Sequence, residues 1–324
     1  MSIGLEQIKA PISNEMREFE TKFRDAMRTK VGLLDRIMTY IVKRKGKQIR
    51  PMLVFLSAGV CGPISDKTFR GATLVELLHT ATLIHDDVVD ESLQRRSLFS
   101  INALWKNKIA VLVGDYLLAR GLLLSVDNED FDLLKISSTA VRLMSEGELL
   151  QLEKSRMMNF REDVYFDIIR MKTASLIASC CAMGAQSIHA GIEQVEKLRL
   201  FGEKVGIAFQ IKDDLFDYEE SGTGKPGGLD IKEKKLTLPI IYALNNCSDA
   251  KRKSILKLIN NFKNEKSQLQ ELFKFIDEHG GIKYAQSKMA SYQQEAFDLL
   301  DTFPESTYRN SLRDLVLYTT SRNY

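Results

Sequence analysis

Three aspartates stand within five residues at the end of an apolar stretch, TATLIHDDVVD (residues 80–90). At about 3.6 residues per helical turn, Asp86 and Asp90 lie about 40° apart and Asp87 about 100° from Asp86, so all three carboxylates are expected on one side. Carboxylates held so close repel one another, and a divalent cation is the usual counter-charge. Their oxygens suit Mg²⁺, which keeps several waters and shares its remaining positions with substrate phosphates. The spacing therefore predicts a metal site that binds a phosphorylated substrate.

The same spacing returns in a second apolar stretch, VGIAFQIKDDLFD (residues 205–217), as Asp213, Asp214 and Asp217. A solvent-exposed acidic helix end would explain one such cluster about as well as a metal site does. Two clusters are harder to explain in that way, because each is embedded in an apolar helix. We expect the two clusters to face each other across a helical bundle and to hold several Mg²⁺ ions around one polyanion.

Several cationic side chains could bind that polyanion. They are Lys47 and Arg50, Arg95 and Arg96, Lys172 beside Thr173, Lys225 in the glycine-rich stretch EESGTGKPGGLD (residues 219–230), and Lys235. Arginine matches phosphate oxygens with a planar fork, and lysine binds them as a point charge. Lys47 and Arg50, expected on one helix face, could instead belong to a solvated basic run. A nucleic-acid surface is disfavoured, because no aromatic residues are interleaved and no wider basic face is present.

His79 lies seven residues before Asp86, almost two helical turns, so both side chains face the same way. A lone histidine on an apolar helix is usually a core residue with its own hydrogen bonds. Its alignment with the acidic cluster makes a contact with a diphosphate an equal alternative.

The elements that must position these residues are helices. Apolar residues recur at helical spacing along nearly the whole chain, strand-like alternation is nearly absent, and there are only six prolines. Turn signals at residues 61–66, 125–132, 189–193, 245–249 and 278–281 separate the helices. We predict an all-α fold of ten or more helices in a single domain (residues 1–324), because no linker or repeat divides the chain. The more charged last third, from about residue 249, is expected to flank the bundle.

The composition is that of a soluble globular protein, with 44% hydrophobic and 27% charged residues among 324. The net charge of +3 gives no reason to expect nucleic acid or an anionic membrane as a partner. Four cysteines without metal-ligand spacing favour a reduced, cytoplasmic protein with free thiols. No signal peptide is evident, and the longest apolar run (109–126) is interrupted by Asp115 and Arg120. We predict that this run is a buried helix and that any membrane contact is peripheral.

Eight motifs follow one another along the chain from about residue 25 to the end. They are GKQIRP, LLHTATLIHDDVVDESLQRRS, VGDYLL, EGELLQ, KTASL, FQIKDDLFDYE, GKPGGLDIKEKKLTLP and YTTSRNY. In type and order they resemble the trans-type isoprenyl diphosphate synthases, and most of all the bacterial long-chain, octaprenyl-type polyprenyl synthases. The resemblance implies an isoprenoid-synthase-type helical bundle around a central cavity, and a homodimer.

The resemblance also implies a role for each predicted residue. Asp86 and Asp90 would ligate two Mg²⁺ ions with Asp87 in support. A third ion would be ligated by Asp213, with Asp214 and Asp217 nearby. The residues that would bind the allylic diphosphate are Arg95, Lys172, Lys225 and Lys235. Those that would bind the diphosphate of isopentenyl diphosphate are Lys47, Arg50, His79 and Arg96. Those that would line the reacting centre are Thr173 and Gln210. Leu229 stands where the family often has a polar residue in the glycine-rich loop.

The implied reaction is the repeated head-to-tail condensation of an allylic diphosphate with isopentenyl diphosphate, with release of pyrophosphate. Three Mg²⁺ ions and the cationic side chains would stabilise the departing pyrophosphate as the allylic C–O bond breaks. The carbocation would form in a cavity that excludes water. The final proton would pass to pyrophosphate, because no side chain in these motifs is an obvious base.

Product length is expected to depend on the residues just before the first aspartate cluster. Ala81 and Thr82 lie one to one and a half turns before Asp86, and both are small. In the family, aromatic residues here go with short products. One isoprene unit spans about one helical turn, so the resemblance implies a deep tunnel and a product of about thirty to fifty carbons. Alternatively, the small residues only allow close helix packing.

Other classes of function remain open. A farnesyl or geranylgeranyl diphosphate synthase would share the motifs and make a shorter product. A class I terpene cyclase shares the fold and one aspartate motif but usually lacks the second. A non-catalytic partner subunit of a heteromeric synthase should have lost aspartates, and a plain helical scaffold leaves six clustered carboxylates unexplained. Transient contact with a membrane surface for product release is a further expectation.

Overall fold

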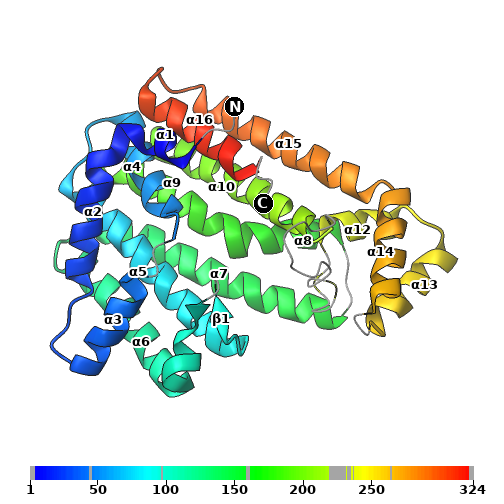
Figure 1. The fold of residues 1–324 in the computed structure, drawn as a ribbon. Helices are drawn as coiled ribbons and strands as arrows, with labels where there is room; N and C mark the ends of the chain where they lie inside the picture. Colours follow the sequence, from blue (N-terminus) through cyan, green and yellow to red (C-terminus); the bar gives the residue numbers. More distant parts are fainter. Residues whose placement is uncertain are drawn as a thin grey trace.

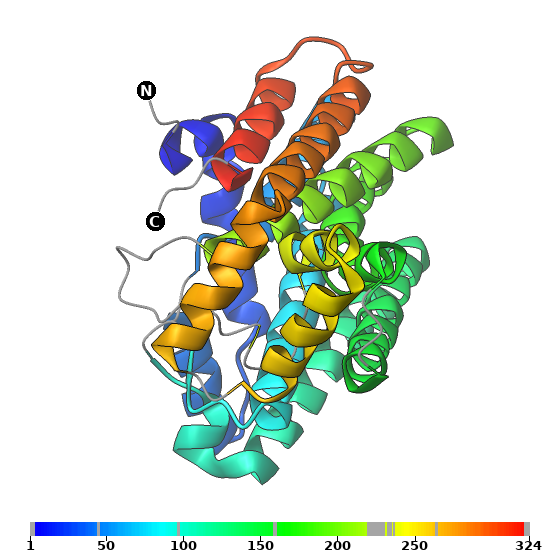
Figure 2. The ribbon, with the colours of Figure 1, turned by 90° about the vertical axis from the view of Figure 1, so that its right-hand side faces the viewer.

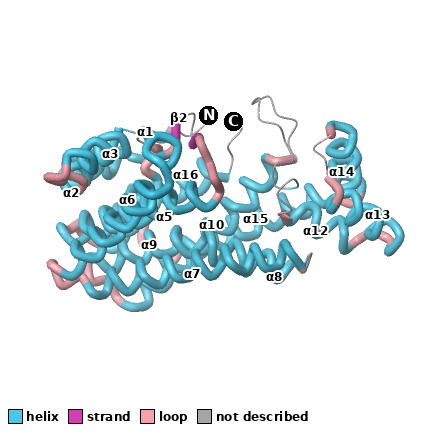
Figure 3. Tube along the Cα trace, turned by 90° about the horizontal axis from the view of Figure 1, so that it is seen from below, coloured by secondary structure: helices cyan, strands magenta, loops and turns pink. Residues whose placement is uncertain are grey.

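The computed structural model describes residues 4–43, 46–95, 98–157, 161–218, 231, 235, 237–262 and 265–320. Within these residues the chain is almost entirely helical, as the apolar spacing predicts (Figure 1). The only strands there form a short antiparallel ladder in which Gln94 pairs with Phe99 (Figure 3). The all-α fold of ten or more helices is therefore confirmed.

The elements follow one another in this order: α1 (Leu5–Lys9), η1 (Ala10–Ile12), α2 (Ser13–Ala26), α3 (Gly32–Lys43), α4 (Ile49–Cys61), α5 (Asp66–Val89), β1 (Gln94–Arg95), β2 (Leu98–Phe99), α6 (Ile101–Val126), α7 (Phe131–Met157), α8 (Glu162–Ile169), the π-helical turn η2 (Arg170–Ala174), α9 (Ser175–Ser187), α10 (Ile192–Phe216), α12 (Leu238–Asn245), α13 (Asp249–Asn260), α14 (Lys266–Glu278), α15 (Gly281–Leu300) and α16 (Thr307–Thr320). The five predicted turns all coincide with boundaries between helices.

Local hydrogen bonds fix where the two aspartate-bearing helices begin. Ahead of α5, the backbone N–H of Ser65 donates to Thr68 Oγ1 at 3.2 Å. Ahead of α10, the backbone N–H of Gly191 donates to Gln194 Oε1 at 3.2 Å. Such bonds satisfy backbone donors that every helix start leaves without an intrahelical partner. Both helices then run for more than twenty residues and carry their aspartates to the far end.

The helices pack as a bundle in which α5 lies against α6, α9 against α4, and α10 against α9 and α15. Buried side chains form three clusters. One joins α4, α5, α9, α10 and α16, a second joins α8, α10 and α12–α15, and a third joins α3, α5 and α6. Because α5 and α10 belong to two clusters each, the ends of these helices are held by packing on several sides.

The last third of the chain divides into two parts. As expected, α13 and α14 stand at one end of the bundle, the end that faces the viewer in Figure 2. The helices α15 and α16 lie along one side of the bundle, where they pack against α10 and α4. The reason is an apolar stripe at helical spacing on α16, where Leu312, Leu315 and Val316 are all buried.

The helix expected to be buried, 109–126, forms most of α6 and buries only one face. About a third of its most apolar stretch is buried, whereas Leu112 is 55% and Leu123 51% exposed. Among the described residues, α6 and the segment Glu162–Ser187 are long and apolar enough to cross a membrane. Length and composition alone are weak evidence for a membrane span, and 61% of the most apolar stretch of Glu162–Ser187 is buried against other helices. The prediction of a buried helix was wrong because α6 lies on the outside of the bundle.

The four cysteines are free thiols, as predicted. Cys180 and Cys181 are completely buried in α9. Burial raises the pKa of the Cys181 thiol to about 12, so its nucleophilic thiolate form is suppressed at neutral pH. These two thiols therefore belong to the packing of the core.

Candidate active site

The first aspartate motif lies at the C-terminal end of α5. Asp86 and Asp87 occupy its last turn, and Asp90 follows it, with its backbone N–H donating to the Asp86 carbonyl at 2.8 Å. Asp86 and Asp90 are exposed, whereas Asp87 is only 3% exposed. The expectation that all three carboxylates share one side is therefore only partly right. The offset of about 100° places the Asp87 side chain on the buried side of the helix. Asn102 Nδ2 of α6 donates to the backbone carbonyl of Asp87 at 3.0 Å.

The second motif repeats this arrangement at the C-terminal end of α10. Asp213 is exposed, Asp214 is 5% exposed, and Asp217 caps the helix. The C-terminus of a helix carries partial negative charge, so acidic clusters there are unfavourable unless a cation neutralises them. Both motifs thus lie at the helix end where a bound cation is most stabilising.

Two side chains hold the buried carboxylate of the second motif. Tyr165, on α8, donates its hydroxyl to Asp214 Oδ2 at 2.6 Å, and Gln210 Nε2 donates to Asp214 Oδ1 at 2.9 Å. Thr173 Oγ1 in turn donates to Gln210 Oε1 at 2.7 Å. Thr173 and Gln210 were predicted for the site, but Tyr165 was missed, because a tyrosine 49 residues from its partner leaves no local signal in the sequence.

Lys172 and Thr173 lie in the π-helical turn η2 rather than in an ordinary helix. Two glycines make room for this turn. A Cβ at Gly147 of α7 would lie 2.9 Å from the Lys172 backbone nitrogen, and one at Gly206 of α10 would lie 2.5 Å from Ala174 Cα. Single π-turns inside helices occur frequently at functional sites. Here the wider turn is clamped between α7 and α10.

Lys172 is held by two residues of the EGELLQ motif. Its Nζ lies 2.5 Å from Glu148 Oε2 and donates to Gln151 Oε1 at 3.3 Å. The lysine side chain is about one-third exposed. It is therefore positioned by α7 yet open to a ligand.

A cavity of about 330 Å³ collects most of these residues. The predicted residues that line it are Lys172, Thr173, Gln210, Asp213, Asp214 and Lys235. Residues that the sequence did not single out also line it, including the cations Lys154 and Arg161 and the phenol of Tyr165. Cations and carboxylates thus meet in one concave site, which is the arrangement expected for a metal-bound diphosphate.

Of the residues predicted to bind the second diphosphate, the three that the structure describes, Lys47, Arg50 and His79, do not line this cavity. Lys47 and Arg50 were expected on one helix face, and this was wrong. The helix begins only at Ile49, because Gln48 has a left-handed backbone with φ 53°. Lys47 lies ahead of the helix, with Nζ 5.4 Å from the ring centre of Tyr318 in α16. His79 is 9% exposed on α5 and Arg50 is partly buried.

Some predicted residues lie outside the described part of the chain. They are Arg96 and Lys225, together with Leu229; for Arg95 only the backbone is described, in β1. Their predicted roles stay predictions.

The two residues predicted to set product length have different surroundings. Ala81 is completely buried in the cluster shared by α3, α5 and α6, with Leu77 and Ile84 on its own helix. Thr82 is partly buried and donates its hydroxyl to the His79 carbonyl at 2.9 Å. Small side chains on α5 therefore accompany close helix packing, and the tunnel stays a prediction.

No three acidic, histidine or cysteine side chains gather closely enough among the described residues to enclose a metal ion. Mg²⁺ does not require such a cage, because it usually takes one or two carboxylates and completes its shell with water and substrate phosphates. Asp213, exposed in a cavity that also holds Lys172 and Lys235, provides this donor set. The residues present therefore fit a Mg²⁺–diphosphate ligand.

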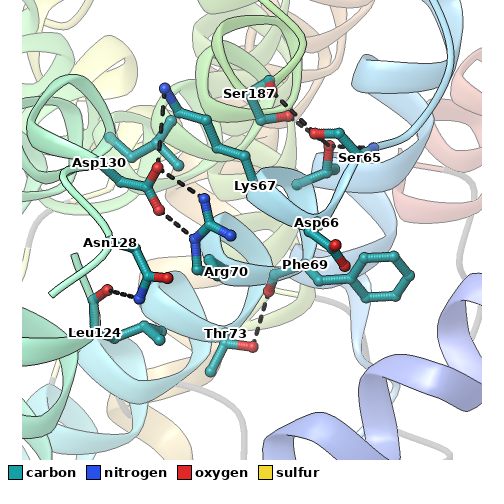
Figure 4. Close-up of polar contacts among 12 residues, drawn as sticks. Ser65, Asp66, Lys67, Phe69, Arg70, Thr73, Leu124, Asn128, Asp130 and Ser187 are labelled. Atoms are coloured by element: carbon teal, nitrogen blue, oxygen red, sulfur yellow. Dashed lines mark hydrogen bonds and ion pairs between the residues drawn. The ribbon is translucent and has the colours of Figure 1, made fainter.

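A second cavity, of about 660 Å³, lies at the N-terminal end of α5, the end away from the first aspartate motif (Figure 4). None of the predicted residues line it. Arg70 donates to both carboxylate oxygens of Asp130, at 2.5 and 3.0 Å, and Lys67 Nζ lies 2.7 Å from Asp132 Oδ2. We call Lys67, Arg70, Asp130 and Asp132 the basal cluster. Its charges are paired within the protein, and it joins α5 to the start of α7.

Known proteins share this architecture. The family model for polyprenyl synthetase matches residues 31–276. The all-trans-nonaprenyl-diphosphate synthase (geranyl-diphosphate specific) of Rhodobacter capsulatus is 37% identical over 97% of this chain and 97% of its own length. The structure of a polyprenyl synthase from Caulobacter crescentus, complexed with calcium and isoprenyl diphosphate, is 31% identical with a TM-score of 0.89. The match covers 99% of this chain and 99% of that one. A geranylgeranyl pyrophosphate synthase structure from Bacteroides thetaiotaomicron is 40% identical with a TM-score of 0.83, covering 98% of this chain and 99% of that one.

The match over most of the chain agrees with the site built above, in which both aspartate motifs end long helices of an all-α bundle. The chain belongs to the polyprenyl synthetase family.

Proposed function

We propose that the protein is a Mg²⁺-dependent prenyltransferase that condenses an allylic diphosphate repeatedly with isopentenyl diphosphate. The observation that carries the proposal is the cavity in which Asp213, Lys172 and Lys235 meet beside Thr173 and Gln210. Carboxylates for a metal and lysines for phosphate oxygens are the groups that ionisation of an allylic diphosphate requires. Calcium and isoprenyl diphosphate in the Caulobacter crescentus relative support a divalent metal beside a diphosphate.

Asp86 and Asp90 would hold two Mg²⁺ ions with Asp87 in support, and Asp213 would hold a third, with Asp214 and Asp217 nearby. When bound, Mg²⁺ neutralises the diphosphate and so favours its departure. Lys172 and Lys235 orient the phosphate oxygens, and the contact of Lys172 with Glu148 keeps its ammonium at the cavity wall. The Thr173 oxygen and the Gln210 amide provide dipoles near the developing positive charge. The apolar lining residues Ile168, Ile169 and Ile241 help to exclude water from it.

The proposed product is a long-chain all-trans polyprenyl diphosphate of about thirty to fifty carbons, estimated from one isoprene unit per helical turn. The nonaprenyl synthase relative supports a long product, and the geranylgeranyl synthase relative supports the shorter-chain alternative. The small side chains of Ala81 and Thr82 favour the long product, because neither would block a tail that descends beside α5.

A homodimer belongs to the same proposal. It is supported by apolar side chains that α6 and α7 expose: Val111, Leu112, Leu122, Leu123 and Val126 on α6, and Leu149 and Leu152 on α7. Burial of one such leucine contributes about 1.5–3 kcal/mol, so a second copy of this face would gain much from covering it. The proposed location is the cytoplasm, with transient contact at the membrane surface for product release. Sedimentation equilibrium tests the assembly.

The reaction is tested with purified protein, Mg²⁺, farnesyl diphosphate and labelled isopentenyl diphosphate, followed by product sizing. We expect products beyond thirty carbons and none after chelation of the metal. A product that stops at twenty carbons would identify a shorter-chain synthase. The absence of any elongation would favour a non-catalytic subunit, and a cyclic hydrocarbon would indicate a terpene cyclase.

Ala81→Phe tests product length directly. A phenyl ring one turn before the aspartates should shorten the product by several isoprene units if the tail passes beside α5. Overpacking of this buried position should also reduce stability by about 1–3 kcal/mol. Thr82→Phe, at a less buried position, provides a second variant. If both variants fold and give wild-type product lengths by mass spectrometry, the tunnel lies elsewhere.

A further inference from the structure

Both carboxylate oxygens of Asp214 accept hydrogen bonds from protein side chains, one from Tyr165 and one from Gln210. Asp214 is 5% and Tyr165 6% exposed, so water competes little for either bond. A neutral donor bound to a carboxylate in such surroundings forms a short and strong hydrogen bond. The orientation of this carboxylate is therefore set by the protein before a metal or substrate arrives.

The phenol comes from a different helix than the aspartate. Tyr165 lies on α8, and its ring packs edge-on against Phe166 with the ring centres 5.3 Å apart. Phe166 in turn packs against Tyr292 of α15, at 5.6 Å. The ring is thus fixed by aromatic contacts, and its hydroxyl ties α8 to the C-terminal end of α10.

The same carboxylate connects to the π-helical turn. Gln210 Oε1 accepts a hydrogen bond from Thr173, and Gln210 Nε2 donates one to Asp214. The amide can make both hydrogen bonds in only one orientation. The hydrogen bonds run from Tyr165 through Asp214 and Gln210 to Thr173, and all four residues line the cavity. If the Tyr165 bond is lost, Asp214 can rotate and the amide loses its fixed acceptor.

We propose that Tyr165 is a positioning residue that acts through Asp214 to hold the second aspartate motif in its metal-binding arrangement. The inference rests on the proposed function, because it assumes that Asp213 binds Mg²⁺. The neighbouring Asp213 and Asp214 share one helical turn, so a fixed Asp214 fixes the end of α10 from which Asp213 projects. Residues that orient a metal-binding group in this way change metal affinity by about 10–100-fold when they are replaced.

The test is Tyr165→Phe, which removes only the hydroxyl. The Mg²⁺ concentration for half-maximal elongation should rise by about 10–100-fold, with a smaller change in kcat at saturating Mg²⁺. A readout without turnover is the Mg²⁺-dependent binding of pyrophosphate by calorimetry, which should weaken to a similar extent. Tyr284→Phe is the matched control, since the Tyr284 hydroxyl donates to Glu162 at 2.7 Å but does not line the cavity. It should leave both measurements unchanged.

A double-mutant cycle with Asp214→Asn separates positioning from a general structural role. If Tyr165 acts through Asp214, adding Tyr165→Phe to Asp214→Asn should cause little further loss of pyrophosphate binding. Wild-type Mg²⁺ dependence in a folded Tyr165→Phe variant, or losses that simply add in the cycle, would overturn the inference. Absence of Mg²⁺-dependent elongation in the wild type would instead overturn the proposed function.

Discussion

The two ends of α5 carry charge in opposite ways. At its N-terminal end, the basal cluster pairs Lys67 and Arg70 with acids of the α6–α7 connection and of α7. At its C-terminal end, Asp86, Asp87 and Asp90 follow one another at the negative pole of the helix. The first group is neutralised by the protein itself. The second gathers like charges where the helix dipole opposes them.

This difference suggests a division of labour along one helix. A buried ion pair within the protein supports the fold in one sense: removing either partner leaves a buried charge and lowers stability. The helix dipole disfavours acids at the C-terminal end of a helix, and metal and substrate that bind there stabilise the folded state. Acids at the two ends should therefore respond to mutation in opposite ways, in activity and in stability.

The largest expected effect is on turnover. Asp86→Ala and Asp213→Ala should each lower elongation by about 10²–10³-fold or more, because each removes a carboxylate that would hold Mg²⁺ on the leaving diphosphate. Far-UV circular dichroism should be unchanged. Asp66→Ala, an acid at the other end of α5, is the control and should retain wild-type turnover. Near-normal Mg²⁺-dependent elongation by either site variant would refute the assignment.

The next effect should fall on stability alone. Arg70→Met leaves the carboxylate of Asp130, 4% exposed, without its arginine fork. Removing one partner of a fully buried pair destabilises a protein by about 3–5 kcal/mol. The loss here should be smaller, because Arg70 is 28% exposed and Lys67 Nζ lies 4.0 Å from Asp130 Oδ1. The midpoint of urea unfolding should fall, while the folded protein keeps its turnover.

The double variant Arg70→Met/Asp130→Leu serves as the control for that pair. It removes both charges and should recover part of the lost stability, because no buried charge is left behind. A fall in turnover in proportion to the fall in stability would contradict the separation of the two ends of α5.

What the sequence could predict depended on the distance between partners. Asp86 and Asp213 were found because each motif spans only five residues at the end of one helix. Within one helix, the spacing of residues determines the direction in which their side chains point. Tyr165 could not be found, because it meets Asp214 only after α8 packs on α10. Lys47 was misplaced because periodicity does not show where a helix begins. That boundary depends on the left-handed backbone of Gln48.

Acid should weaken the basal cluster through Asp132. Burial, the largest single influence on its carboxyl, raises the pKa, but hydrogen bonds from Lys67, Gln186 and the Leu133 backbone N–H together hold the pKa below its ordinary value. The folded state therefore gains stability from this group above the unfolded pKa of about 4 and loses it as pH falls through the lower folded pKa. Asp132→Asn should lower the melting temperature at pH 7. The difference from wild type should shrink below about pH 4.

The smallest expected effect is a gain in folding stability, opposite in sign to the losses above. It tests the contrast between the two ends of α5 most directly. Asp90→Asn removes one negative charge from the C-terminal end of α5, where the helix dipole disfavours it. Without Mg²⁺ the variant should be more stable than the wild type, by about 0.3–1 kcal/mol in denaturant unfolding at low salt. With Mg²⁺ and pyrophosphate the order should reverse, because only the wild type gains the full binding energy of the ligand. If Asp90→Asn is destabilising without ligand, the acids at this end contribute to the fold as those of the basal cluster do, and the contrast between the two ends of α5 is lost.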